Sequence, residues 1–321
     1  MIVWGPPGVG KTATITAEAE AIGYRVVVLV GNCRAPEDFV GLPSIVDGVA
    51  RYSPQGWAAD IAEGEQVLVL LDELTTCTPA VMAAMLRVVQ ERHVGDLRLP
   101  DSVRIIAAAN PAGMGGGTRP LSPPLANRFV HADFAFDAAA WSEWMIANHQ
   151  GSAALGPVLG FLRSRADLLL AGVPLDAASA GGAWPSPRSW DAAVAICATA
   201  ERSAWLGLIA TAVGIGAASE WATWFDRADL PDSRAVLADP SSVTWSKLRP
   251  DQTHAILVSC VALAAGDADL RVQAFGLLAA VGEVAPDLGV AALAGLIRAC
   301  PDAPIPFGSL GAYSDFLSAL R

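Results

Sequence analysis

The sequence predicts an α/β fold over residues 1–136 and a helical remainder. Runs of consecutive apolar residues, many of them β-branched, are typical of strands buried on both faces of a parallel sheet. Such runs occupy Arg25–Val30, Val67–Leu71 and Val103–Ala109. From Asp137 onward, apolar residues recur at helical spacing instead. We therefore expect an α/β domain at 1–136, a helical domain at 137–235 and a helical extension at 236–321.

A glycine-rich loop lies between the apolar run 1–4 and the helix-compatible run 13–21. Glycines let backbone N–H groups turn inward and bind phosphate oxygens at a helix N-terminus. Lys11 would reach the β- and γ-phosphates of a nucleotide, and the Thr12 hydroxyl would bind Mg²⁺. An incidental lysine in a Gly/Pro turn is the alternative, but lysine is rare here: only Lys11 and Lys247 occur among 21 basic residues. The loop, which matches G-x-x-x-x-G-K-[ST] at every fixed position, consists of Gly5, Pro6, Pro7, Gly8, Val9, Gly10, Lys11 and Thr12.

The composition excludes several classes of protein. With 53% hydrophobic and 17% charged residues in 321, the chain is globular and long enough for two domains. A net charge of −11 without a Lys/Arg cluster disfavours nucleic acid as the main partner. The cysteines are scattered, as expected for thiols in a reducing compartment. The uncharged run Ser203–Ser219 is short for a bilayer span, so we expect a buried helix there and no membrane insertion. We expect a cytoplasmic protein without a signal peptide, since the glycine-rich loop begins at residue 5.

Two carboxylates follow the strand predicted at Val67–Leu71. The carboxyl ends of parallel strands form the edge at which α/β sheets bind ligands. Asp72 is placed to hold Mg²⁺ through water, and Glu73 to orient and deprotonate the water that attacks the γ-phosphate. An acidic pair after a strand is common by chance. The phosphate-binding loop upstream is what favours the catalytic interpretation.

Asn110 follows the strand predicted at Val103–Ala109 and belongs to the same edge. Its neutral amide can orient the attacking water between Glu73 and the γ-phosphate. Taken alone, an asparagine before a proline is more often a turn residue. Local signals also predict a hairpin at 45–52 turning at Asp47-Gly48, a helix at 57–63, a helix beginning at Thr78-Pro79 and a hairpin at 91–100 with Gly95-Asp96 near its turn.

Together these segments resemble an AAA+ ATPase, most closely the MoxR-type, dynein-related group. The hairpin at 45–52 falls where this group inserts one into its second helix, and 91–100 resembles the hairpin before sensor 1. Residues 184–190 resemble the lid motif that carries the sensor 2 arginine. The implied fold is a P-loop NTPase core, with a parallel sheet flanked by helices, followed by an all-α lid at 137–235. The segments that carry the resemblance, in the order of the family, are 5–12, 67–73, 105–111 and 121–129.

The resemblance also implies roles for single residues. Asn110 corresponds to sensor 1, Arg128 to the arginine finger that reaches the γ-phosphate in a neighbouring subunit, and Arg188 to sensor 2. A finger acting in trans makes hydrolysis dependent on a ring, usually a hexamer. Arg119 is either a second trans-acting arginine or an exposed loop residue. The family also encloses adenine with a segment before the first strand, and here only residues 1–4 precede Gly5. Either the true start lies upstream, or the base is recognised differently.

The implied function is Mg²⁺-dependent ATP hydrolysis, coupled to chaperone-like remodelling or activation of a client protein. Such proteins often act alongside a partner with a von Willebrand factor A domain. Two other functions stay open: a nucleotide-gated assembly scaffold with little turnover, and an AAA+ motor that acts on nucleic acid. The retained Glu73, Asn110 and Arg128 argue against the scaffold, and the acidic charge balance argues against the motor.

Overall fold

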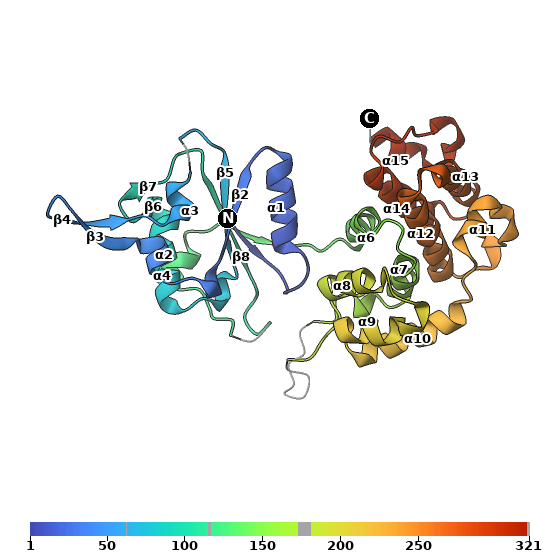
Figure 1. The fold of residues 1–321 in the computed structure, drawn as a ribbon, viewed down its shortest axis with the longest axis horizontal. Coiled ribbons are helices and arrows are strands. Elements are labelled where there is room, and N and C mark those ends of the chain that lie inside the picture. Colours follow the sequence, from blue (N-terminus) through green and yellow to red (C-terminus); the bar gives the residue numbers. More distant parts are fainter. Residues whose placement is uncertain (62, 115–116, 173–180, 320–321) are drawn as a thin grey trace. The chain divides into compact units, whose positions relative to one another are not determined.

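The computed structural model describes residues 1–61, 63–114, 117–172 and 181–319, which form two compact units. The first unit comprises residues 1–136 and the second residues 137–321 (Figure 1). The first is built on a parallel sheet flanked by helices, and the second is helical.

The sheet of the first unit has five strands in the order β2-β5-β8-β1-β9, and every neighbouring pair is parallel. In β5 all residues from Val67 to Leu71 are buried, because the sheet is covered on both faces. The register pairs Val30 with Asp72 and Trp4 with Ala109, so the carboxyl ends of these strands meet at one edge. The predicted α/β class is confirmed. The strands are β1 (Ile2–Trp4), β2 (Arg25–Val30), β5 (Val67–Asp72), β8 (Arg104–Ala109) and β9 (His131–Asp133).

Helix α4 shows how the sequence fixes the helices around this sheet. The Thr78 side chain caps it by accepting a hydrogen bond from the N–H of Val81 at 3.3 Å, and Pro79 takes the first position, as predicted. Its buried face includes Met85 and Val88, both 0% exposed. Helix α3 is a single turn, shorter than the helix expected at 57–63. The helices are α1 (Lys11–Ala21), α2 (Glu37–Val40), α3 (Gly56–Ala59), α4 (Pro79–Glu91) and α5 (Pro123–Ala126).

Both predicted hairpins are present. The first pairs β3 (Leu42–Val46) with β4 (Val49–Ser53) and projects from the unit (Figure 1). Asp47 and Gly48 have φ values of 52° and 76°, the left-handed conformation that a two-residue type I′ turn requires. The second pairs β6 (His93–Val94) with β7 (Leu97–Arg98). The turn of the second hairpin contacts the base of the first, where the N–H of Asp96 donates to the Tyr52 carbonyl at 2.8 Å.

The second unit is a packed set of helices. Helix α12 lies against α7, and α14 lies against α6. The uncharged run Ser203–Ser219 is divided between α9 and α10, which separate at Gly214 (φ 85°). In the described ranges, no helix is long and apolar enough to cross a membrane. The principal helices are α6 (Ala138–Asn148), α7 (Leu155–Ser164), α8 (Pro187–Cys197), α9 (Trp205–Val213), α10 (Ile215–Ala228), α11 (Ser233–Ala238), α12 (Pro250–Gly266), α13 (Arg271–Gly282), α14 (Pro286–Ala299) and α15 (Ser314–Ala319).

The expected division of the helical part at residue 235 is not a gap in the packing. Helices α12 and α14 come from the C-terminal extension, yet they pack on α7 and α6 from the expected lid. Trp190 and Trp221, which are 0% and 2% exposed, fill the interior of this unit. Residues 137–321 form one compact unit, and the boundary between a lid and an extension at residue 235 stays a prediction.

Candidate active site

The phosphate-binding loop (Gly5–Thr12) connects β1 to α1. Gly8 and Gly10 have φ values of 79° and 95°, a conformation that costs glycine little. Gly10 is also the N-cap of α1, and its carbonyl accepts the N–H of Thr14 at 2.9 Å. The first turn of the helix thus starts directly at Lys11. The unpaired N–H groups of such a turn, together with the helix dipole, favour an anion.

Lys11 joins the loop to the neighbouring strand. Its Nζ donates to the carbonyls of Gly5 and Pro6 and to Oδ1 of Asn110, each at 2.8 Å. The side chain is 7% exposed, so these acceptors replace the water that a buried ammonium loses. The sequence separates Lys11 from Asn110 widely, and the parallel sheet brings them together because β1 and β8 are neighbours.

Thr12 and Asp72 form the second link across this edge. The Thr12 hydroxyl donates to Oδ2 of Asp72 at 2.6 Å, and Oδ1 of Asp72 accepts the N–H of Glu73 at 2.8 Å. A hydroxyl beside a carboxylate is an oxygen donor set of the kind that suits Mg²⁺. The described residues contain no group of three or more His, Cys, Asp or Glu side chains arranged for a metal. Mg²⁺ commonly takes one or two protein ligands and completes its shell with phosphate and water, so the residues fit this ion.

Glu73 sits in a strained turn directly after β5. Its φ and ψ are 57° and 34°, a left-handed conformation that is uncommon outside glycine and that clusters at functional sites. The Thr76 hydroxyl donates to the Glu73 carbonyl at 2.8 Å and lies 3.3 Å from Oε2 of the Glu73 carboxylate. This turn places the second carboxylate at the edge of the sheet that carries Asp72.

Thr75 is a positioning residue that the sequence reasoning missed. It is 2% exposed, and its hydroxyl donates to the Asn110 carbonyl at 3.0 Å while accepting the N–H of Asn110 at 3.2 Å. The Thr75 carbonyl accepts the N–H of Arg119 at 2.7 Å. A hydroxyl residue so close after the acidic pair was the available signal, but hydroxyl residues are too common in turns for it to stand out.

The three arginines considered from the sequence are all exposed. Arg128 lies just after α5, and its N–H donates to the Leu125 carbonyl at 3.1 Å. Arg119 is tied to the site through its backbone, as described above. Arg188 belongs to the second unit, near the start of α8, where the Ser186 side chain caps the helix. The structure therefore gathers Lys11, Thr12, Asp72, Glu73 and Asn110 around one sheet edge in the first unit.

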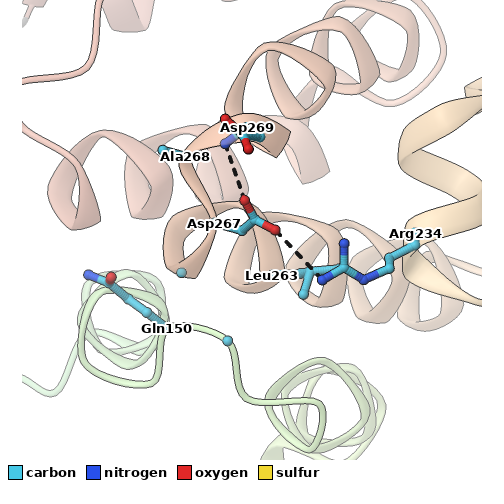
Figure 2. A pocket seen from close by; sticks show the side chains of 8 residues that line it. Gln150, Arg234, Leu263, Asp267, Ala268 and Asp269 are labelled. Atoms are coloured by element: carbon cyan, nitrogen blue, oxygen red, sulfur yellow. Dashed lines mark hydrogen bonds and ion pairs between the residues drawn. The ribbon is translucent and has the colours of Figure 1, made fainter.

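A hollow of about 490 Å³ lies in the second unit, and none of these residues lines it (Figure 2). Asp267 has two partners among the residues that line the hollow: its carboxylate pairs with Arg234 at 3.6 Å, and Oδ1 of Asp267 accepts the backbone N–H of Asp269 at 3.2 Å. We assign no chemistry to it. It is lined by Gln150, Gly151, Arg234, Leu263, Gly266, Asp267, Ala268 and Asp269.

Comparison with known proteins identifies the first unit. The family model described as "AAA domain (dynein-related subfamily)" matches residues 1–129. The N-terminal unit is an AAA+ ATPase domain. The recognition of this domain from the loop, the acidic pair and the segments that follow is thereby confirmed.

Other similarities cover between about half and three quarters of the chain. Midasin from Giardia intestinalis is 26% identical over 156 residues, which are 46% of this chain and 3% of midasin. A solved structure described as a candidate ATPase from Cytophaga hutchinsonii covers 66% of this chain and 76% of its own, at 15% identity and a TM-score of 0.33. The RuvB Holliday junction branch migration motor of Thermotoga maritima covers 74% of this chain and 66% of its own, at 15% identity and a TM-score of 0.37.

Proposed function

We propose that this chain assembles into a ring, the hexamer usual in its class, and hydrolyses ATP with Mg²⁺ at sites shared between neighbouring copies. One copy supplies the loop, the carboxylates and Asn110, and the next supplies Arg128. The observation that carries the proposal is the network that joins Lys11 to Asn110 and Thr12 to Asp72, while Arg128 is exposed to solvent. Because the Arg128 side chain is exposed to solvent, it can reach the nucleotide of a neighbouring copy.

The chemistry assigns one task to each group. Lys11 would exchange its carbonyl acceptors for β- and γ-phosphate oxygens, and Thr12 with Asp72 would hold Mg²⁺, which neutralises charge on those oxygens. Glu73 would accept the proton of the attacking water, and the Asn110 amide would orient that water. Arg128 of the neighbouring copy would stabilise charge that develops on the γ-phosphoryl group, a contribution of about 10³-fold or more in related NTPases.

The output we propose is the remodelling or activation of a client protein, alongside a partner with a von Willebrand factor A domain. The β3–β4 hairpin supports a protein-contacting role because it exposes large apolar side chains that a purely catalytic domain does not need. Ile45, for example, is 74% exposed. The large hydrophobic residues that this hairpin exposes are Leu42, Ile45, Val46, Val49 and Tyr52.

Three variants and one mixture test the shared site. Lys11→Ala should lose nucleotide binding, and Glu73→Gln should bind ATP without hydrolysing it. Arg128→Ala should bind ATP normally but show a kcat reduced by about 10³-fold. Mixing Arg128→Ala with Lys11→Ala copies should restore part of the activity, because intact loops then face intact arginines. Wild-type hydrolysis by Arg128→Ala alone would show that the site is not shared.

The same proteins separate the motor from the scaffold. A pull-down with Glu73→Gln in the presence of ATP should enrich a client that is absent with Lys11→Ala. Wild-type protein that assembles with ATP, yet turns over no ATP when assembled, would instead support the scaffold.

A further inference from the structure

We propose that His131 is a positioning residue for Arg128: together with Trp4 it forms a clamp that fixes the turn carrying Arg128 against strand β1. The inference rests on the proposed function, since it assigns His131 a part in presenting the finger to the neighbouring copy. Three described contacts carry it, one between the two rings, one from the imidazole to the turn, and one from the turn back onto itself.

The first contact joins the two rings. Nε1 of Trp4 donates to Nδ1 of His131 at 2.9 Å, and the rings stack with centroids 5.8 Å apart and planes 15° from parallel. An indole N–H can only donate, so Nδ1 of His131 must accept and carries no proton. The bond therefore selects one tautomer of a neutral imidazole, in which Nε2 bears the hydrogen.

The second contact uses that hydrogen. Nε2 of His131 lies 2.9 Å from the carbonyl oxygen of Ala126, which accepts the hydrogen bond. Ala126 is the last residue of α5, and Arg128 lies two positions beyond it. Both nitrogens of the imidazole are thus occupied, one holding it to β1 and the other holding the end of α5.

The third contact closes the turn around Arg128. The Ala126 carbonyl also accepts the N–H of Phe129 at 3.3 Å. This one oxygen therefore accepts hydrogen bonds from both Phe129 and His131, which follow Arg128 in the chain. Leu125 and Phe129 are buried in the core of the unit on either side of it. The Arg128 backbone is therefore held at both ends while its side chain is exposed. This is the arrangement expected of a group that must reach outward from a rigid base.

The clamp also ties the turn to the strand that leads into the phosphate-binding loop. Trp4 directly precedes Gly5, and the Trp4 carbonyl accepts the N–H of Phe134 at 2.7 Å. The N–H of Ile2 donates to the Val130 carbonyl at 2.8 Å, which holds the other end of the same segment. The turn that carries Arg128 is thus attached to β1, the strand that leads into the phosphate-binding loop of the same copy. Loss of the clamp should weaken hydrolysis in the neighbouring copy and spare nucleotide binding in its own.

The test uses the full chain with His131→Ala. We expect kcat to fall by about tenfold, since a misplacement of about 1 Å in a catalytic group can cost about 100-fold. KM and the Kd for ATP should change less than twofold. Mixing His131→Ala with Lys11→Ala copies should restore activity, because Lys11→Ala copies carry an intact clamp and His131→Ala copies carry an intact loop. A merely structural histidine would lower stability without giving this complementation.

Further variants separate the two bonds and control for the loss of an imidazole. Trp4→Phe removes the indole N–H together with the five-membered ring that carries it, and keeps an aromatic ring beside His131, so its effect on kcat should not add to that of His131→Ala. The asparagine side chain of His131→Asn is shorter than the imidazole, so its amide can accept from Trp4 but cannot also extend a donor to the Ala126 carbonyl that Nε2 reaches. This variant should resemble His131→Ala and guards against a misfolded alanine variant. His93→Ala removes a partly exposed imidazole that also bonds a backbone carbonyl, that of Glu91, and should leave kcat within twofold of wild type.

Wild-type kcat in both His131→Ala and His131→Asn would overturn the clamp. So would a loss of activity that Lys11→Ala copies do not rescue, because the defect would then lie in the copy's own loop. Arg128→Ala and Lys11→Ala copies could restore each other's activity while mixtures of His131 variants with Lys11→Ala do not. That result would refute the clamp and leave the shared site standing. If Arg128→Ala is itself fully active, the shared site fails and the clamp fails with it.

Discussion

At the scale of single residues, both backbone groups of Asn110 depend on one hydroxyl, that of Thr75. Thr75→Val keeps the volume of the side chain but leaves the buried N–H of Asn110 without its partner, at a cost of about 1–3 kcal/mol. Asn110 would then shift from the place where its amide can orient water. We expect kcat to fall by about tenfold with an unchanged Kd for ATP, measured by steady-state hydrolysis and nucleotide titration.

Thr75→Ser is the matched control for that change. It retains the hydroxyl that serves Asn110, and kcat should stay within about threefold of wild type. Equal losses in the serine and valine variants would show that the methyl group, and not the hydroxyl, is what the site needs.

The residues of the site divide into those that a sequence can show and those that it cannot. Lys11 and Thr12 belong to a loop whose chemistry demands fixed spacing, and Asp72 follows a strand that is apolar throughout. Thr75 and His131 act through hydrogen bonds to backbone atoms of distant or adjacent turns. Backbone groups are the same in every residue, so no pattern of side chains marks which of them needs a partner.

At the scale of elements, α7 packs on α12 through two glycines. A Cβ at Gly160 would lie 2.9 Å from the Asp251 carbonyl, and one at Gly156 would lie 2.5 Å from the Ala255 carbonyl. Backbone atoms within a helix cannot move aside as a flexible side chain can. We expect Gly156→Ala and Gly160→Ala each to destabilise the second unit by about 1–3 kcal/mol, measured by urea unfolding.

Gly276, in the interior of α13, provides the control for these two substitutions. Apart from its chain neighbours and the backbone of its own helix, no atom would lie within 4 Å of a Cβ there, so Gly276→Ala should be neutral or should stabilise the unit by up to about 1 kcal/mol. Destabilisation by Gly276→Ala that matches the α7 variants would mean that helix packing is not the cause.

The elements were predictable where a local rule decides them. Asp47 and Gly48 form the turn of a hairpin because both adopt positive φ, which few residue types tolerate. The helix expected at 57–63 shortens to the single turn of α3, where Trp57 donates its indole N–H to the Asp38 carbonyl at 3.0 Å. This tertiary hydrogen bond holds the segment in place, and the sequence pattern of a short amphipathic stretch does not predict such a contact.

At the scale of the whole molecule, the sequence predicted which residues meet at the sheet edge better than the assembly that we propose to complete the site. A parallel sheet dictates that residues ending neighbouring strands meet, so the order of the strands is enough to bring Lys11 to Asn110. The order of the strands does not determine which group Arg128 meets. Its proposed partner is a phosphate held by another copy, and neither the strand order nor the core of one chain constrains that meeting.

A single buried group, the His254 imidazole, should make the stability of the second unit depend on pH. His254 lies on α12 and is 4% exposed, and burial, with a smaller contribution from the Arg163 charge, lowers its pKa from 6.5 to about 4. Between these values the unfolded chain binds a proton that the folded chain does not. Stability is therefore lost as the pH falls from about 6.5 towards 4, by about 2 kcal/mol between pH 7 and pH 5.

Urea unfolding at pH 7 and pH 5 measures this loss, followed by tryptophan fluorescence because most of the 10 tryptophans lie in the second unit. His254→Leu has no group to titrate in this window and should lose about 2 kcal/mol less than wild type over the same interval. Asp251, whose pKa is lowered although burial alone would raise it, loses its contribution only below its ordinary value of 3.8. It therefore does not obscure the comparison. Parallel losses in wild type and His254→Leu would place the acid sensitivity elsewhere in the chain.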